Sequence, residues 1–417
     1  MINDKEIEDI IQAEELRQQN EICLIASENL PSPDAMKVCG SIMMAKYSEG
    51  YPRHRYYGGC VNVDALEDLA RKRACELFGA EHANVQPPSG SHANQCAYAS
   101  ILNIGDTILA PSLQSGGHLT HSSPVSFVTK LYNVVPYDVN KDTYLLDYDE
   151  IERLAEEYKP KLILCGYSAY SRLLDFERFR KIADKVGAYL MCDMAHFAGL
   201  VAAKVIPSPV PYCDIVTTTT HKTLRGVRGG LILCKKELAK AIDKAVFPQN
   251  AGGCLQNMVA GKAICFKEDM SEDFKEYAKQ VLLNAKVLCA NLKKEGMKIL
   301  TDGTENHLMV IDLRGTGVTG AMLEHGLEQV GVATNKNSIP FDTEKPTVTS
   351  GLRIGTPSVT TRGMKEQEMI LIAKIISNTF NQLKEHGELS ENFINLTSLV
   401  VKQLTDKFPI AINEIRR

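Results

Sequence analysis

The chain has 417 residues, of which 44% are hydrophobic, so it is long enough for a large core and for two domains. Its 47 Lys and Arg residues against 51 Asp and Glu residues give a net charge of −4, and no basic block stands out, which disfavours nucleic acid as a partner. The N-terminus is charged from the start and no apolar run approaches the length of a membrane span, so we expect a cytoplasmic protein.

The order of helical and strand patterns predicts an α/β fold. Amphipathic helices are expected over residues 4–20 and 33–45, followed by an irregular Tyr- and Gly-rich stretch up to Gly59. Short apolar strands then alternate with helices or loops, which is the pattern of a mainly parallel sheet covered on both faces. These expected strands are 107–110, 129–135, 161–165, 188–192 and 230–234.

A charged helix over about 269–295 leads to a second region of mixed pattern. There we expect strands at 298–300, 307–313 and 351–355 and helices at 319–330, 363–385 and near the C-terminus. The chain is therefore divided into an N-terminal helical arm (1–52), a large domain (53–270) and a smaller α+β domain (271–417).

Lys222 stands just after a run rich in β-branched residues, Ile215 to Thr220, and shortly before Gly226. β-Branched residues favour strands and a glycine breaks the pattern, so the lysine is expected at a buried strand end. A desolvated ammonium loses its charge more easily and can then attack an aldehyde, which is the chemistry of Schiff-base enzymes that use pyridoxal phosphate. The alternative is a strand-terminal lysine that points into water.

A second apolar strand pattern, Ala188 to Cys192, is followed by Asp193 and then by His196. In open α/β sheets ligands bind beyond the carboxyl ends of the strands, so Asp193, His196 and Lys222 would face one crevice. A carboxylate in that place keeps the nitrogen of a pyridine ring protonated. Taken alone, Asp193 would more often cap the next helix, but its spacing from Lys222 favours the ring partner.

The residues Ser89, Gly90 and Ser91 connect a short strand to a helical pattern over 95–102. Free backbone N–H groups at a helix N-terminus, together with small hydroxyl side chains, bind phosphate without a lysine. The same serines could equally serve only as helix caps, and the two roles are compatible.

The twelve cysteines predict neither disulfides nor a metal site. Most of them lie inside apolar runs and none forms a C-x-x-C pair, so we expect reduced core thiols at Cys165, Cys192, Cys234, Cys265 and Cys289. His118 and His121 are spaced like metal ligands, but no cysteine or acid at ligand spacing accompanies them, and we expect no metal.

Motifs distributed over nearly the whole chain resemble serine hydroxymethyltransferase, a fold-type I pyridoxal phosphate enzyme. They are Leu24–Asn29, Tyr47–Pro52, Arg55–Gly59, Gly116–His121, Asp193–His196, Thr217–Lys222, Asn335–Ser338 and Thr349–Arg353. The resemblance implies a fold-type I transferase, with a mainly parallel seven-stranded sheet in the large domain.

The resemblance also implies a role for each cofactor-binding position. Lys222 would form the Schiff base with pyridoxal 5'-phosphate, Asp193 would pair with the pyridine nitrogen and His118 would stack on the ring. Ser168 and His196 would lie near the phenolic oxygen, while Gly90, Ser91 and His221 would hold the phosphate. Tyr47 and Gly253 would reach the phosphate of the neighbouring subunit, which implies an obligate homodimer and leaves a tetramer open.

The substrate positions are implied in the same way. Arg353 would bind the substrate carboxylate, for which a planar guanidinium is better suited than an ammonium. Glu49 would move the proton at the hydroxymethyl oxygen and contact the folate, with Tyr57 near the imine. Without the resemblance, Glu49's neighbours Tyr47, Tyr51, Tyr56 and Tyr57 would equally well form a packing or subunit-contact cluster. The folate-contacting positions are Leu113, Gly117, Leu119 and Asn337.

The implied reaction transfers the hydroxymethyl carbon of serine to tetrahydrofolate, which gives glycine and methylenetetrahydrofolate. Several positions depart from the family pattern: Arg53, His54, Pro88, Val227, Gln249, Ala251, Cys254 and Asn257. Because the segment from Gln249 to Asn257 shapes the dimer-side entrance, a second hypothesis stays open. It is a relative that acts as a folate-independent aldolase for β-hydroxy amino acids or on an α-substituted amino acid. A third, a silent relative that binds a partner or RNA, is disfavoured by the intact Lys222, Asp193, His118 and Arg353.

Overall fold

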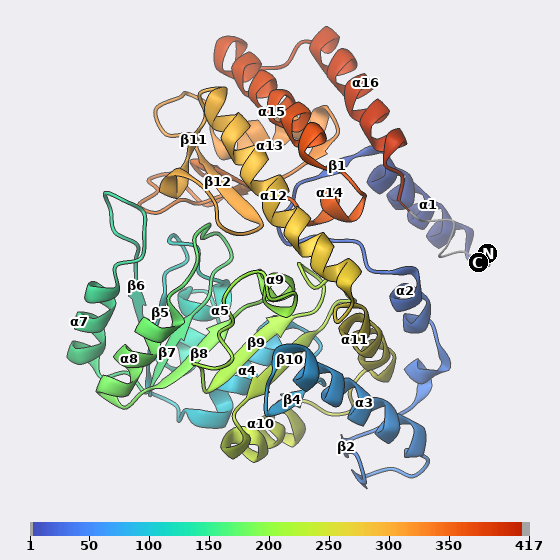
Figure 1. Cartoon of the computed structure of the whole chain (residues 1–417), viewed down its shortest axis with the longest axis vertical. Helices are drawn as coiled ribbons and strands as arrows, with labels where there is room; N and C mark the ends of the chain where they lie inside the picture. Colours follow the sequence, from blue (N-terminus) through green and yellow to red (C-terminus); the bar gives the residue numbers. More distant parts are fainter. Residues whose placement is uncertain (1–2, 411–417) are drawn as a thin grey trace. The chain divides into compact units, whose positions relative to one another are not determined.

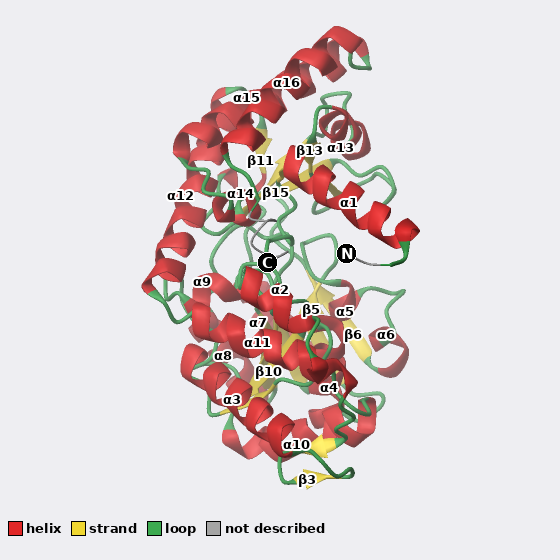
Figure 2. Cartoon of the chain, turned by 90° about the vertical axis from the view of Figure 1, so that its right-hand side faces the viewer, coloured by secondary structure: helices red, strands yellow, loops and turns green. Residues whose placement is uncertain are grey.

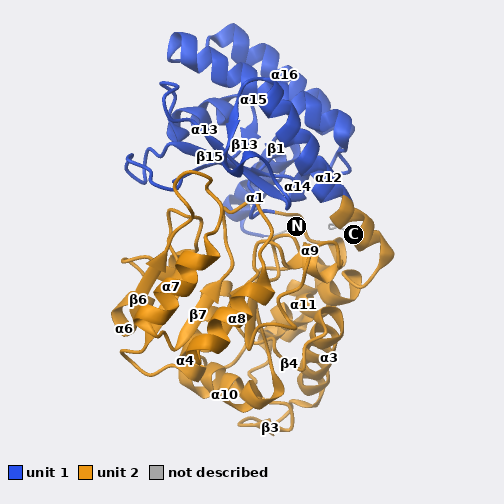
Figure 3. Ribbon diagram, turned by 60° about the vertical axis from the view of Figure 1, so that its left-hand side comes forward, with its two compact units in different colours: residues 1–28, 280–417 blue, residues 29–279 orange. Residues whose placement is uncertain are grey.

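A computed structural model describes residues 3–410 of the chain and divides it into two compact units. Unit 1 consists of residues 1–28 and 280–417, and unit 2 of residues 29–279 (Figure 3). No helix among residues 3–410 is both long and apolar enough to cross a membrane.

Unit 2 is built on a seven-stranded sheet with the strand order β4-β10-β9-β8-β7-β5-β6 (Figure 1). Strand β10 is antiparallel to both of its neighbours, and the remaining pairs are parallel. The strands are β4 (His82–Asn84), β5 (Thr107–Pro111), β6 (Asn133–Tyr137), β7 (Leu162–Cys165), β8 (Tyr189–Asp193), β9 (Ile215–Thr219) and β10 (Gly230–Cys234). This sheet confirms the expected mainly parallel, seven-stranded α/β architecture.

Helices cover both faces of this sheet, because the residues of its central strands are almost all buried. Every residue of β7, β9 and β10 is buried, as is typical of strands packed on two sides. On one face, Ala93 and Ala97 of α4 (Gly90–Ile101) share a core with Leu164 and Ile215. Elsewhere α7 (Tyr148–Tyr158) and α8 (Phe176–Val186) pack against each other and against β5 to β8.

The remaining elements of unit 2 are short apart from α3 and α11. They are α2 (Pro33–Cys39), α3 (Val61–Phe78), α5 (Leu119–Ser122), α6 (Val128–Leu131), α9 (Ala198–Ala202), α10 (Ala239–Lys244) and α11 (Gln256–Glu268), the hairpin β2 (Gly50–Tyr51) and β3 (His54–Arg55), and the turns η1 (Ile42–Ala45), η2 (Lys236–Leu238) and η3 (Ala245–Asn250). Helix α11 packs on both α2 and α3.

Unit 1 is an α+β assembly around a four-stranded antiparallel sheet of order β11-β12-β15-β14. Its strands are β11 (Lys298–Ile299), β12 (Leu308–Asp312), β14 (Asn335–Asn337) and β15 (Gly351–Gly355), with a separate pair of β1 (Ile22–Cys23) and β13 (Val332–Ala333). The helices are α1 (Lys5–Asn20), α13 (Gly320–Gln329), α14 (Pro357–Thr361), α15 (Glu366–His386) and α16 (Glu391–Lys407), with the short turn η4 (Leu300–Asp302) (Figure 2). Helix α12 (Glu272–Lys294) begins in unit 2 and continues into unit 1, because the boundary at 279/280 falls within it.

Three predictions of local structure are wrong. The expected strand 129–135 is the helix α6 followed by β6, and the expected helix 33–45 ends at Cys39, where Gly40 is the cap and the separate turn η1 follows. The stretch before Gly59 is not wholly irregular, since it contains the β2–β3 hairpin.

The compact units also divide the chain differently from the expected domains. Residues up to 28 join the C-terminal part because β1 pairs in parallel with β13, and the boundary lies at 279/280 rather than near 270. The functional domains 1–52, 53–270 and 271–417 stay a prediction.

Candidate active site

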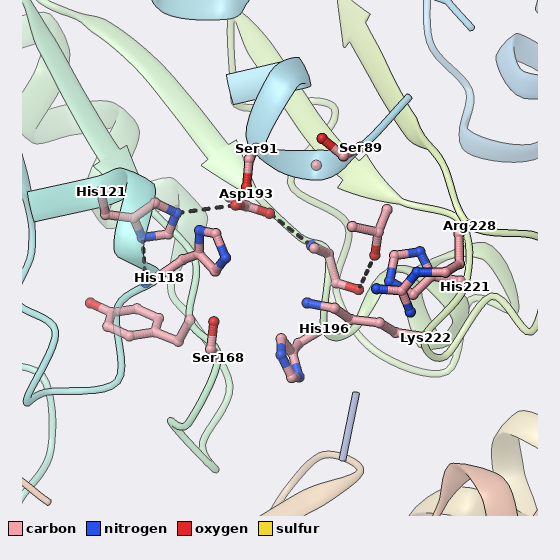
Figure 4. A pocket seen from close by; sticks show the side chains of 14 residues that line it. Ser89, Ser91, His118, His121, Ser168, Asp193, His196, His221, Lys222 and Arg228 are labelled. Carbon is pink, nitrogen blue, oxygen red and sulfur yellow. Dashed lines mark hydrogen bonds and ion pairs between the residues drawn. The ribbon is translucent and has the colours of Figure 1, made fainter. Parts of the chain in front are cut away.

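Unit 2 contains a cavity at the edge of the sheet where the parallel strands end. It is lined by Ser89, Gly90, Ser91, His118, His121, Tyr167, Ser168, Asp193, Ala195, His196, Thr219, His221, Lys222 and Arg228 (Figure 4). Asp193 is the last residue of β8, Lys222 follows β9, and Ser168 follows β7. Because these strands are parallel, their carboxyl ends meet at the same edge, which is where ligands bind in such sheets.

The cavity brings together eight residues that the sequence assigns to the cofactor. They are Gly90, Ser91, His118, Ser168, Asp193, His196, His221 and Lys222. They come from five separate segments of the chain, so their convergence is a property of the fold. The role of each one stays a prediction.

Lys222 lies on a loop whose backbone is fixed by hydrogen bonds. Its carbonyl oxygen accepts hydrogen bonds from the backbone amide of Arg225 and from the side-chain amide of Asn29, both at 3.0 Å. The backbone amide of Gly226 donates to the carbonyl of Thr220 at 2.8 Å. The Lys222 side chain is 9% exposed and reaches towards the middle of the cavity (Figure 4). Its amine is therefore held in a defined place with little access to bulk water.

Asp193 is a buried carboxylate held by three donors. Oδ2 accepts the side-chain amide of Asn94 at 2.8 Å and Nε2 of His121 at 3.1 Å, and Oδ1 accepts the amide of Ala195 at 3.0 Å. Burial acts against the charge, but the His121 and Asn94 hydrogen bonds hold the pKa of Asp193 well below its ordinary value. Asp193 is consequently ionised at neutral pH, as a partner for a protonated ring nitrogen must be.

An acid does lie next to His118 and His121 in the folded chain. It is Asp193, which is 72 residues beyond His121 in sequence and therefore gave no spacing signal. One ligand atom from each of the three residues lies within 4.8 Å of the others, a distance that would suit a metal ion. However, Nδ1 of His121 accepts the backbone amide of His118 at 3.1 Å, and Nε2 donates to Asp193. Both ring nitrogens of His121 are thus used within the protein, which favours a role in orienting Asp193 over metal binding.

An anion cradle lies at the N-terminus of α4. The Ser89 hydroxyl accepts the amide of His92 at 3.2 Å and so caps the helix, while the preceding amides of Gly90 and Ser91 have no carbonyl partner within a helix. His221 contributes a buried Nδ1 that has no hydrogen-bond partner among the described residues. Burial, with the nearby charges of Arg228 and Lys222, lowers the pKa of His221 to about 3, so this imidazole is neutral. Its unsatisfied nitrogen requires a ligand atom or water.

A second cluster, formed by Tyr47, Glu49, Tyr57 and Gly253, lies outside the set of described residues that line the cavity. The Tyr47 and Tyr57 rings are edge to face at 5.0 Å, and the Tyr47 hydroxyl donates to Glu49 Oε1 at 3.3 Å. A Cβ on Gly253 would lie 3.4 Å from the Tyr47 ring. Tyr47 and Tyr57 are 57% and 48% exposed, Gly253 is also exposed and Glu49 is half-buried, so the group lies at the surface of unit 2.

The expected folate and substrate positions are distributed over both units. In unit 2, Leu113 and Leu119 are exposed and flank the buried Gly117. In unit 1, Asn337 lies on β14 and donates to the carbonyl of Ser338 at 2.6 Å. Arg353 lies on β15, where its Nε donates to Asn335 Oδ1 at 3.0 Å and burial lowers the pKa of its guanidinium to about 10.

Four residues at the cavity or behind it were not assigned a role from the sequence: Asn94, His121, Tyr167 and Arg228. Arg228 carried a signal, because it lies in the glycine-flanked loop directly after Lys222. Asn94 gave no local signal, and the spacing of His121 did not indicate its partner, since both residues bind a carboxylate that is distant in sequence.

The serine hydroxymethyltransferase family model matches residues 1–376. This match includes most of the chain and both clusters described above, and the chain belongs to the serine hydroxymethyltransferase family. Members of this family are one-carbon transferases of the fold-type I class that bind pyridoxal phosphate through a lysine.

Proposed function

From membership in this family, we propose that the chain interconverts serine and glycine and transfers the hydroxymethyl carbon to tetrahydrofolate. The observation that carries the proposal is the combination, in one cavity, of the buried Lys222, the ionised Asp193 and the unsatisfied Nδ1 of His221. The unsatisfied Nδ1 of His221 requires a partner atom, and pyridoxal phosphate would complement it together with the amine of Lys222 and the charge of Asp193.

The residues of the cavity fit this cofactor group by group. Lys222 would hold the aldehyde carbon, Asp193 the ring nitrogen, and the cradle of Gly90, Ser91 and His221 the phosphate. When bound, pyridoxal phosphate supplies a ring that accepts electrons from the α-carbon of an amino acid. His121 and Asn94 would keep the Asp193 charge in place, so that the ring nitrogen retains its proton.

The surface cluster supports the proposal of a homodimer with shared sites. Glu49 lies close to Tyr47 and Gly252 but is absent from the described lining of the cavity in its own chain. We assign this cluster to the cavity of the partner subunit, where Glu49 and Tyr57 would handle the proton of the hydroxymethyl group and Tyr47 would reach the phosphate. A surface carboxyl beside two tyrosines is well placed for proton transfer once a partner buries it.

Arg353 would bind the substrate carboxylate. A half-buried guanidinium whose pKa is lowered by desolvation gains from an anionic substrate, and the hydrogen bond from its Nε–H to Asn335 fixes the plane of the group. Leu113, Gly117, Leu119 and Asn337 would contact the folate.

The test measures the purified protein with glycine and with serine, each with and without tetrahydrofolate. We expect a visible absorbance band from the lysine-bound cofactor, its loss in Lys222→Ala, and faster exchange of the glycine α-proton when folate is added. A protein without bound cofactor would contradict the enzyme proposal as a whole. An unchanged rate of glycine exchange and serine cleavage on adding folate would contradict the folate-dependent reaction.

A second candidate is a folate-independent aldolase for β-hydroxy amino acids, and the segment from Gln249 to Cys254 favours it. This segment adjoins the proton-handling cluster, since a Cβ on Gly252 would lie 3.2 Å from Glu49 Oε1. The carbonyl of Asn250 accepts Nε2 of His92 at 3.1 Å. Faster cleavage of threonine than of serine, with no response to folate, would support this candidate over the first.

A further inference from the structure

Lys262 on α11 is a buried lysine whose ammonium binds only backbone carbonyls in the described hydrogen bonds. The residue is 1% exposed. Nζ donates to the carbonyls of Val85 at 2.6 Å, Pro87 at 2.8 Å and Gly230 at 2.8 Å. An ammonium has three N–H groups, so its hydrogen-bonding capacity is used in full.

The three carbonyls belong to the backbone on which the anion cradle is built. Val85 and Pro87 lie in the connection from β4 to α4, and Pro87 is two residues before the helix cap Ser89. Gly230 is the first residue of β10. The amide of Gly230 donates to the carbonyl of Pro87 at 2.9 Å, so Lys262 binds both sides of one backbone junction. A change in the position of Lys262 would therefore move the N-terminus of α4.

The backbone closes tightly around this lysine. A Cβ on Gly229 would lie 2.3 Å from Lys262 Cε, and one on Gly230 would lie 2.2 Å from the carbonyl oxygen of Ser89. Neither position tolerates a side chain without displacing the lysine stem or the phosphate-binding turn. The glycines and the lysine thus act together to fix that turn.

The charge of Lys262 is met by carbonyl dipoles rather than by a hydrogen-bonded carboxylate. The nearby Glu67 is already bound by Arg55 at 2.7 Å and by the side-chain amide of Gln86 at 2.9 Å. Burial lowers the pKa of Lys262 to about 7, while Cys254 and Glu67 act in the opposite direction. An apolar side chain would fill this space without the desolvation penalty, so the lysine is best explained by the geometry it imposes on the three carbonyls.

We propose that Lys262 is a positioning residue for the phosphate-binding turn, residues 85–91, and that it makes the cavity selective for a phosphorylated cofactor. This inference rests on the proposed use of pyridoxal phosphate. It assigns Lys262 no contact with the cofactor. Its effect passes through the backbone of Val85, Pro87 and Gly230 to the amides of Gly90 and Ser91.

The experiment compares pyridoxal phosphate with pyridoxal, which lacks the phosphate, in the cofactor-free full-length protein. The dissociation constant of each is measured for the wild type, Lys262→Met, Lys262→Ala and Phe266→Ala. Phe266 is a fully buried residue one helical turn further along α11, and it serves as the matched control for general loss of packing. Thermal unfolding of each variant without cofactor reports on folding.

The preference is the ratio of the dissociation constant of pyridoxal to that of pyridoxal phosphate. We expect Lys262→Met to lower this ratio by about tenfold or more, which corresponds to the loss of hydrogen bonds from one charged donor. Phe266→Ala should weaken the binding of both ligands to the same extent, so that the ratio does not change. In Lys262→Ala, added n-propylammonium should restore the preference, because this ion replaces the three removed carbons and returns three N–H groups to the carbonyls.

Two results would overturn the inference. One is an unchanged preference in a folded Lys262→Met protein, and the other is an equal loss of preference in Phe266→Ala. A wild type that binds both ligands equally would instead show that the proposed phosphate site is absent, and the role of Lys262 would be rejected with it. If Lys262→Met does not fold, the propylammonium response of Lys262→Ala decides the question.

Discussion

At the scale of single residues, Asp193 is the group on which the electronics of the site depend. Its charge is stabilised by His121, Asn94 and the Ala195 amide, and all three are donors. A carboxylate bound only by donors keeps its pKa low, so it retains a strong attraction for a protonated ring nitrogen. The neighbouring residues therefore matter as much as the acid itself.

Replacing Asp193 by Asn keeps the size of the side chain but removes its charge. We expect Asp193→Asn to bind the cofactor and to lose about 100-fold or more in kcat for serine cleavage, because the ring nitrogen is no longer held protonated. Steady-state kinetics and the absorbance of the bound cofactor check this. Asn94→Ala, which removes one donor and leaves the charge, should lose less. Full activity in Asp193→Asn would contradict the proposed pairing.

The protonation of His221 gives a prediction for stability against pH. Its pKa is lowered from 6.5 to about 3 in the folded cofactor-free protein, so the unfolded chain binds a proton first as the pH falls below 6.5. The contribution of His221 to stability is therefore complete above pH 6.5 and is lost progressively between pH 6.5 and about 3. At pH 5 this loss amounts to about 2 kcal/mol.

Urea unfolding of the cofactor-free protein at pH 7 and pH 5 measures this effect. The wild type should lose about 2 kcal/mol more than His221→Asn on going to pH 5, because asparagine does not titrate. The difference between the two proteins removes the contribution of carboxylates such as Asp193, which also lose stability in acid. Equal losses in both proteins would show that His221 titrates near its ordinary pKa in the folded state.

At the scale of secondary-structure elements, the N-terminus of α4 combines a structural cap with the proposed phosphate site. The Ser89 hydroxyl satisfies the amide of His92, which leaves the amides of Gly90 and Ser91 for a ligand. We expect Ser89→Ala to lower the free energy of unfolding of the cofactor-free protein by about 1 kcal/mol. Chemical denaturation measures this value.

Ser100, on the last turn of the same helix, provides a matched control. Its hydroxyl donates to the Ala97 carbonyl and caps no free amide. Ser100→Ala should therefore change stability by less than about 0.5 kcal/mol. If the two substitutions have equal effects, the cap at Ser89 does not stabilise the helix.

The elements that could be predicted from the sequence are those with long, regular patterns. The run over β9 is rich in β-branched residues, the run over β10 is apolar and begins after Gly229, and both are indeed strands. The prediction of a single strand over 129–135 was wrong because no glycine or proline separates the helix α6 from the strand β6. Val134 and Val135 of β6 therefore look continuous with the apolar residues of α6. The two-residue strands β2 and β3 are too short to give a pattern.

The same distinction applies to the candidate site. The positions of Lys222 and Asp193 follow from strand ends in a parallel sheet, which local pattern and topology can predict. The donors to Asp193 and the three carbonyls bound by Lys262 come from segments that are distant in sequence, so only the folded chain brings them together. For the same reason, spacing could not identify Asp193 as the acid beside His118 and His121.

At the scale of the whole molecule, pairing between distant segments determines how the chain is divided. The two residues of β1 bind β13, and Ile22 and Leu24 enter the core of unit 1 with Leu352 and Ile354. An N-terminal arm could not be placed in that unit from its sequence, because a two-residue strand has no periodicity. In the proposed dimer, segments of two different chains would likewise come together, since Glu49 of one chain would lie in the cavity of the other.

The proposed sharing of sites predicts complementation between two inactive variants. Lys222→Ala lacks the cofactor-holding amine, and Glu49→Gln lacks the proposed proton-handling group. If Glu49 acts in the partner's cavity, a hybrid dimer contains one site with both native residues and one with neither. Random mixing gives half of the dimers as hybrids, each with one intact site of two, so activity should recover to about a quarter of the wild-type value.

The two variants are unfolded together, refolded and assayed for serine cleavage, with each variant refolded alone as a baseline. A mixture of Lys222→Ala with Asp193→Asn is the matched control, because both residues line the cavity of the same chain and no hybrid site contains both native groups. We expect recovery in the first mixture and none in the second. Equal activity in the two mixtures would place Glu49 in the site of its own subunit, since only exchange between chains can reunite Lys222 of one chain with Glu49 of the other.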